Sequence, residues 1–283
     1  MKQLQAKPRF IPAGRVLDPL VIGRGPKTRP VTGVIPDATG KRPDSELDGA
    51  DLPDLAVRAA SVRGEDHRRR GTPRRDAMGL WQIDEARLLA CVATGVADGE
   101  LSHVGSADAC SAAYRNLPGL LRHVERGAPA ESFFADVAGD LRGRAERDRV
   151  TVDALGTALL VAVIDTGEHR AHVARVGDGA ATLLRDGLWT PCLPEAAGAA
   201  SSATLPGDAA SVETATVDLR RGDMLLLCTG GLARPLRGEQ VSDQVSAWWT
   251  QPTTPSLPEF FWQLSFRAES HEDDRTAVCA WRL

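Results

Sequence analysis

The stretch that most constrains the fold covers residues 222–232 and reads GDMLLLCTGGL. A polar turn leads into an uninterrupted apolar run, residues 224–228, which ends in a threonine and two glycines. A short apolar run between turn residues is typical of a strand that is buried on both faces. We therefore treat this strand as the one around which the rest of the chain is organised.

The composition is that of an ordinary globular protein, with 283 residues, 42% hydrophobic and 25% charged. A net charge of -4 and a pI near 5.9 give no indication of a nucleic-acid or membrane partner. No apolar run approaches the roughly 18 residues of a membrane span, and no secretory signal is evident, so we expect a cytoplasmic protein. The five cysteines lack CxxC spacing and are interpreted as core residues in a reducing compartment, not as a zinc site.

Residues 1–55 are rich in proline, glycine and charged side chains and show no sustained periodicity. Such a segment buries little apolar surface, so we predict a disordered or loosely docked leader. The more apolar patch at residues 10–22 is the part that would dock locally. Residues 56–283 are predicted to form a single domain.

The pattern of the domain predicts strands connected by hairpins, together with paired helices. Strands are expected at residues 55–62, 86–94, 155–165, 171–176, 213–219, 224–228 and 276–281, with a further strand-turn-strand around Asp186-Gly187. Helices are expected at residues 106–124, broken or kinked at Pro118, and at 131–148, 243–249 and 258–270. Hairpins imply antiparallel sheets, and helix pairs imply layers on the sheet faces. The prediction is an α+β four-layer α/β/β/α sandwich.

Five stretches, in order, resemble motifs of the metal-dependent serine/threonine protein phosphatases of type 2C (PPM-type), in a bacterial branch of the family. They are residues 61–77 (SVRGEDHRRRGTPRRDA), 156–165 (GTALLVAVID), 174–189 (ARVGDGAATLLRDGLW), 223–232 (DMLLLCTGGL) and 271–281 (HEDDRTAVCAW). The resemblance covers about residues 56–283. It implies two Mg or Mn ions that activate a water for direct attack on phosphorus, and an arginine that holds the phosphate.

The resemblance also implies which residues would bind the metal. Asp76 corresponds to the aspartate of the first strand, and Asp273 to that of the closing strand. Gly230 stands where the family has the aspartate of Thr-Asp-Gly. Nearby acids that could compensate are Asp98, Asp223, Glu272 and Asp274, whereas Asp178 resembles a structural loop acid.

The family's Val-Ala-Asp-Gly motif can be aligned with this chain in two ways. In one register, Thr94 takes the place of the aspartate, and Ser102 and Gly105 then follow at the spacing of the bacterial branch. In the other register, Asp98 is retained, but a glycine moves into the buried strand, which is disfavoured. We favour the Thr94 register. Two positions, Thr94 and Gly230, would then lack a ligand, and we expect weakened or absent binding of Mg or Mn.

An arginine-rich loop precedes Asp76. By resemblance, Arg70, Arg74, Arg75 and His67 are candidates for binding a phosphate. The alternative is a solvated basic loop, in which His67 makes only a local hydrogen bond.

Three functions remain open on this reasoning. The favoured one is a pseudophosphatase that binds a phosphoprotein or regulates a partner such as a serine/threonine kinase. The second is an active phosphatase with a reduced, single-metal site built from Asp76, Asp273 and Asp98. The third is a structural or scaffold role for the same fold.

Overall fold

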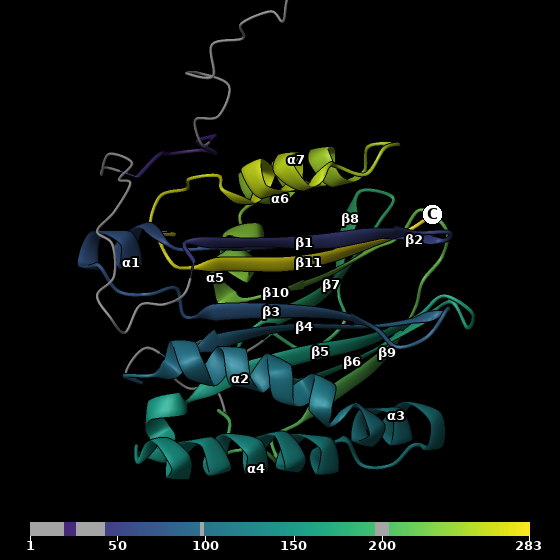
Figure 1. The fold of residues 1–283 in the computed structure, drawn as a ribbon. Coiled ribbons are helices and arrows are strands. Elements are labelled where there is room, and N and C mark those ends of the chain that lie inside the picture. Colours follow the sequence, from purple (N-terminus) through teal and green to yellow (C-terminus); the bar gives the residue numbers. More distant parts are fainter. Residues whose placement is uncertain (1–19, 27–42, 97–98, 196–203) are drawn as a thin grey trace, which may run out of the picture.

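Two antiparallel sheets stack face to face, and helices cover the outer side of each (Figure 1). The computed structural model describes residues 20–26, 43–96, 99–195 and 204–283. The six-stranded sheet has the order β1-β2-β11-β10-β7-β8, and the five-stranded sheet has the order β3-β4-β5-β6-β9. The α+β four-layer sandwich predicted from the sequence is confirmed.

The strands are β1 Ser45–Leu52, β2 Leu55–Val62, β3 Asp76–Gln82, β4 Arg87–Gly95, β5 Thr157–Asp165, β6 Arg170–Val176, β7 Ala180–Arg185, β8 Leu188–Pro191, β9 Glu213–Asp218, β10 Met224–Cys228 and β11 Arg275–Arg282. The helices are α1 Glu65–Arg70, α2 Ser102–Arg115, α3 Leu117–Arg126, α4 Ala130–Asp148, α5 Gly230–Ala233, α6 Glu239–Trp249 and α7 Leu257–Leu264. Two short 3-10 turns are η1 Val152–Leu155 and η2 Pro235–Arg237.

Strand β10 lies inside the six-stranded sheet, between β11 and β7, and all five of its residues are buried. Because side chains alternate along a strand, Leu225 and Leu227 pack between the two sheets. Met224, Leu226 and Cys228 pack on the other face, against α6 and α7. The strand buried on both faces, expected from residues 224–228, is confirmed.

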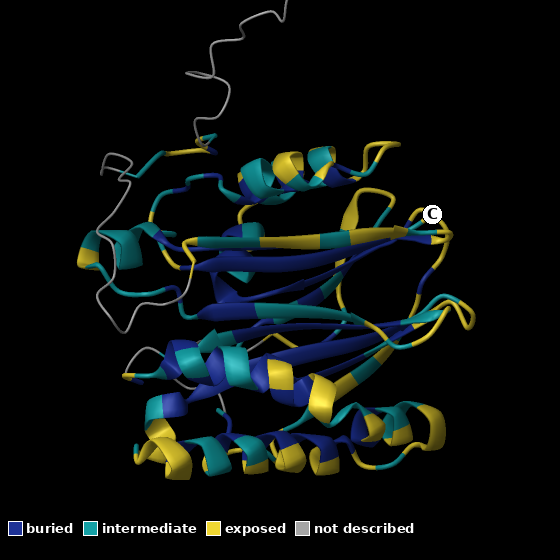
Figure 2. Ribbon diagram, in the orientation of Figure 1, coloured by how far each residue is buried: buried dark blue, intermediate teal, exposed yellow. Residues whose placement is uncertain are grey.

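The helices cover the sheets in the way that their apolar faces require. Helices α2, α3 and α4 pack on the five-stranded sheet, and Phe133, Phe134 and Leu141 of α4 are fully buried. On the opposite side, α6 and α7 cover the six-stranded sheet through Trp249 and Phe260. Figure 2 shows the resulting pattern, with buried strands inside and half-exposed helices outside.

The ordered part of the chain begins earlier than predicted. Residues 45–52 form β1, which pairs along its whole length with β2, although they fall inside the predicted leader. Farther upstream, Val21 makes a parallel bridge to Arg267, and Ile22 is buried against the outer helices. Local docking is therefore found for residues 20–22, and residues 1–19 and 27–42 lie outside the described part.

The predicted helix 106–124 is two helices, with Pro118 in the first turn of α3, where a missing N–H costs no hydrogen bond. The helix predicted at 258–270 ends at Leu264, and the buried Arg275 guanidinium donates hydrogen bonds to the carbonyl groups of Leu264 and Phe266 just beyond the last turn. Helix α6 begins four residues before the predicted start, at Glu239.

The described residues contain no helix that is long and apolar enough to cross a bilayer. All five cysteines are free thiols, and only Cys192 is not fully buried. The prediction of core cysteines thus holds for four of them.

Candidate active site

A polar cluster closes one end of the layer between the sheets. The strand alternation that points Leu227 and Val278 into this layer also points Thr229 and Thr276 there. Asp76, at the start of β3, faces them from the opposite sheet and is only 2% exposed. A carboxylate from one sheet thus meets hydroxyl groups from the other.

The Asp76 carboxylate is held by three threonines. The Thr229 hydroxyl donates to its Oδ2 at 2.6 Å, and the Thr276 hydroxyl donates to the same atom at 2.8 Å. The Thr94 hydroxyl, from the neighbouring strand β4, makes a further hydrogen bond. Burial, reinforced by the nearby Asp274 charge, raises the pKa of Asp76 to about 6, although the threonine hydrogen bonds act in the opposite direction.

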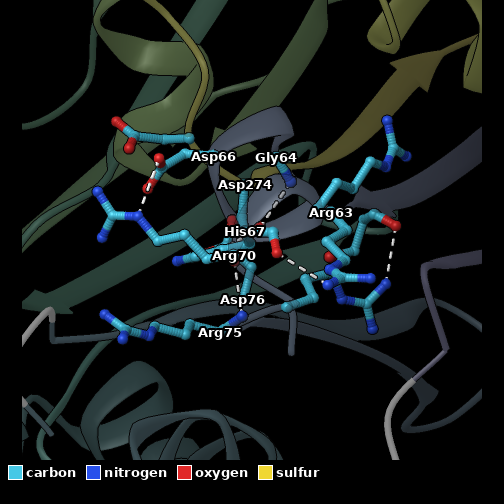
Figure 3. A network of polar contacts seen from close by, with 12 residues as sticks. Arg63, Gly64, Asp66, His67, Arg70, Arg75, Asp76 and Asp274 are labelled. Atoms are coloured by element: carbon cyan, nitrogen blue, oxygen red, sulfur yellow. Dashed lines mark hydrogen bonds and ion pairs between the residues drawn. The ribbon is translucent and has the colours of Figure 1, made fainter. Parts of the chain in front are cut away.

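Asp274 lies beside Asp76 and is likewise held by protein groups (Figure 3). Its Oδ1 accepts the Gly64 backbone N–H at 2.7 Å and lies 2.8 Å from His67 Nδ1, which donates when it carries the proton. Its Oδ2 accepts the Arg75 backbone N–H at 2.6 Å. Asp274 therefore anchors the arginine-rich loop to the start of β11.

Thr94 lies directly opposite Asp76 in the pairing of β3 with β4. Ser102 and Gly105 are both buried in α2, and a Cβ on Gly105 would overlap the backbone carbonyl of Leu155. Thr94 thus lies within the polar cluster. Asp98 lies outside the described residues.

Arg234 connects two acids that lie far apart in the sequence. Its Nη2 lies 2.6 Å from Asp273 Oδ2, just before β11, and its Nη1 lies 3.2 Å from Asp178 Oδ2, just after β6. Asp178 was expected to be structural, and its Oδ1 accepts the Gly179 N–H at 2.9 Å. Gly230, one helical turn before Arg234, presents no side chain to these groups.

Only two of the four predicted phosphate-binding residues reach the cavity. Arg75 and His67 line the cavity at this end of the sheets. Arg74 is fully buried, donates to the Ser61 carbonyl at 2.8 Å and pairs with Glu46, so the prediction that it binds phosphate is wrong. Arg70 was also predicted to bind phosphate. Its side chain is 70% exposed, pairs with an acid of its own helix and does not line the cavity.

The cavity has a volume of about 550 Å³ and opens between the ends of the two sheets. Its lining includes Asp76, Thr94, Gly95, Asp178, Gly230, Gly231, Arg234, Asp273 and Asp274. It also includes a loop at residues 204–207. The space would accommodate a phosphorylated side chain.

Two of the acids considered as compensating ligands lie elsewhere. Asp223 is buried and forms an ion pair with Arg185, away from the cavity. Glu272 pairs with Arg69 on helix α1. Neither lines the cavity.

Mg and Mn ions bind several carboxylate and water oxygens. Among the residues that the structure describes, no three His, Cys, Asp or Glu side chains are grouped so that they could hold one ion. Asp76 and Asp274 bind protein donors, and Asp273 binds Arg234. As they lie, these residues do not fit a pair of divalent ions.

Three contributors were missed from the sequence. Thr229 and Thr276 could have been found by extending the alternation of β10 and β11 by one position. Arg234 could have been found from its position four residues after Gly230, where one helical turn brings it alongside.

The family model for protein phosphatase 2C matches residues 63–261. No curated protein matches the chain significantly. Among solved structures, RsbX in complex with magnesium is similar with a TM-score of 0.57 at 15% identity, covering 84% of this chain and all of that one. PppA, a key regulatory component of T6SS in Pseudomonas aeruginosa, gives 0.58 at 17% identity, covering 83% and 100%. The catalytic domain of the phosphatase PstP with two manganese ions gives 0.51 at 18%, covering 80% and 97%.

These likenesses each cover at least 80% of this chain. At such low identity the structural similarities establish the fold alone. The family model, however, spans well over half of the chain, from Arg63 in the arginine-rich loop to Phe261 in α7. The chain therefore belongs to the protein phosphatase 2C family.

Proposed function

We propose that this chain is a type 2C phosphatase-like protein with impaired catalysis, which binds a phosphoprotein or regulates a partner such as a serine/threonine kinase. One observation carries the proposal. The carboxylates of Asp76 and Asp274 are already engaged by protein hydrogen-bond donors, and Gly230 supplies no carboxylate at all. These residues are therefore poorly suited to hydrolysis that requires two bound divalent cations.

Weak or absent binding of Mg or Mn is part of this proposal. Each acidic ligand offsets part of the cost of dehydrating a divalent ion, and the number of charged ligands sets the affinity. The relatives RsbX and PstP are described with magnesium and with manganese. In this chain Thr94 offers a neutral oxygen, and it already bonds Asp76.

A phosphate-binding role is supported by the cavity and by Arg75. This arginine lines the cavity next to Asp76, and its backbone is fixed by Asp274. A guanidinium can grip a phosphoryl group with two parallel hydrogen bonds. Binding without hydrolysis would then need no metal.

The alternative is an active phosphatase that uses a single ion. Asp273 favours it, because this side chain lines the cavity and is 63% exposed. An ion that displaced Arg234 could reach it there. Asp98 would be its expected second ligand.

Two measurements on the purified chain test the proposal. The first is manganese-dependent hydrolysis of p-nitrophenyl phosphate by the wild type and by Asp273→Asn. The second is binding of a pool of phosphoserine and phosphothreonine peptides, compared with the same pool unphosphorylated. We expect equal, background hydrolysis for both proteins and binding that requires phosphorylation.

Arg75→Ala should weaken peptide binding by about tenfold or more, because a charge-assisted contact to phosphate is lost. Arg70→Ala is the matched control, since it removes the same charge from an exposed side chain outside the cavity. Hydrolysis that Asp273→Asn abolishes would establish the single-ion alternative instead. Absence of both hydrolysis and phosphorylation-dependent binding would refute both functions.

A further inference from the structure

The guanidinium of Arg234 joins two loops at the cavity. Asp178 lies in the short link between β6 of the five-stranded sheet and β7 of the six-stranded sheet, and Asp273 precedes β11 of the six-stranded sheet. One cation therefore neutralises both an acid at the crossing between the two sheets and an acid at the start of β11. The Asp178 side chain is 14% exposed, so this part of the contact is largely shielded from water.

The Arg234 guanidinium occupies the space that a side chain at position 230 would take. A Cβ added to Gly230 would overlap both the Asp178 carboxylate and the Arg234 guanidinium. The backbone does not require glycine here, since Gly230 is not among the residues with positive φ. The missing side chain thus provides space, and the arginine fills it.

The charges around the cavity explain why a cation is needed there. Asp76, Asp178, Asp273 and Asp274 all line it, and together they would repel one another. An arginine stays charged at all ordinary pH values and reaches two carboxylates through its planar fork. Because it is covalently attached, it cannot be removed by a chelator.

We propose that Arg234 is a built-in cation that takes the place of a divalent ion, so that this end of the sandwich is held together without Mg or Mn. This inference rests on the proposed weakness of metal binding. It goes further by naming the group that keeps a metal out. Removing the arginine should uncover a cation site made of Asp178 and Asp273.

The test is manganese binding by titration calorimetry, together with thermal unfolding in chelator and in manganese. The wild type should unfold at the same temperature in both solutions. Arg234→Ala should bind manganese at least about tenfold more tightly than the wild type, because two carboxylates become available. It should also be stabilised by the ion.

Arg237→Ala is the matched control, since this exposed arginine lies three residues on and pairs with Glu195 at 3.5 Å. It should behave as the wild type does. Arg234→Lys keeps the charge and should still exclude manganese. Adding Asp273→Asn to Arg234→Ala should abolish the gain.

The outcomes separate this inference from the proposed function. Tight manganese binding by the wild type would overturn both. If the wild type binds none and Arg234→Ala gains none, the built-in cation is refuted while the proposed function stands. If Arg234→Ala does not fold, Arg234→Lys decides: manganese binding by this charged variant, in a folded protein, refutes the inference, and its exclusion supports it.

Discussion

Replacing Asp76 by asparagine should stabilise the protein at neutral and alkaline pH. The carboxyl is 2% exposed, and its pKa is raised from 3.8 to about 6 by burial and by Asp274. A shift of roughly two units corresponds to about 3 kcal/mol in the free energy of unfolding. The ionised form is the disfavoured one, so the wild type carries this penalty when the pH is above about 6.

The penalty should depend on pH in a defined way. Because the folded-state pKa lies above the unfolded one, the protonated carboxyl contributes full stability below about pH 4, and this is lost as the pH rises through about 6. At about pH 8 the Asp76→Asn variant should therefore be more stable by up to about 3 kcal/mol. Between about pH 8 and pH 5, roughly 1.4 kcal/mol of that advantage should disappear.

The assay is urea unfolding of both proteins at the two pH values, followed by tryptophan fluorescence with chelator present. The amide of asparagine can still accept the hydroxyl groups of Thr229 and Thr276. Asp136→Asn, which removes an exposed acid on α4, is the matched control. An Asp76→Asn advantage that is absent at pH 8, or equally large at pH 5, would refute the reasoning. Manganese that selectively restored the wild type would show that Asp76 binds an ion.

Further predictions concern packing and the metal. Arg74→Ala should destabilise the protein by roughly 3 kcal/mol in urea unfolding, because it leaves a cavity in place of a fully buried side chain and removes the hydrogen bond to the Ser61 carbonyl; a loss below about 0.5 kcal/mol would contradict its buried role. Gly105→Ala should cost about 1–3 kcal/mol, seen as a lower unfolding temperature, because its Cβ would overlap the backbone of η1; an unchanged temperature would count against that close approach. The triple variant Thr94→Asp, Gly230→Asp, Arg234→Ala should bind manganese about tenfold or more tightly than the double variant that retains the arginine. Equal affinities in calorimetry would contradict the inference that Arg234 occupies the space of a side chain at position 230.

The strands and their layers could be predicted because hydrophobic periodicity reports burial directly. The run at residues 224–228 has an apolar side chain at every position. This pattern is typical of a strand that is covered on both faces. The hairpin at Asp186-Gly187 could be predicted because both residues adopt positive φ, which this dipeptide favours.

Strand β1 escaped prediction because it is an edge strand. Its sequence, SELDGADL, is acidic and half-exposed, and its stability comes from backbone pairing with β2. Charged side chains are common on such edges, where they discourage association with other chains. The composition of residues 45–52 therefore resembles that of the leader predicted for residues 1–55.

The sequence could not show which arginines line the cavity and which are buried, because residues adjacent on one loop face different environments. Arg74 points into the protein and Arg75 lines the cavity, although they are adjacent. Arg234 lies far from this loop in the sequence and reaches the cavity only through the turn of α5. The direction of a side chain depends on local backbone geometry, which a charge count does not report.

The pairing of β2 with β11 has a consequence for how the molecule forms. Two strands from opposite ends of the described chain are neighbours along their whole length, between Leu55–Val62 and Arg275–Arg282. Joining them closes a loop that contains nearly the entire domain, at a large cost in chain entropy. Topologies dominated by such distant partners assemble slowly. Until that seam closes, β1 and β2 have no neighbour on their inner side, and an intermediate would expose this apolar edge to aggregation.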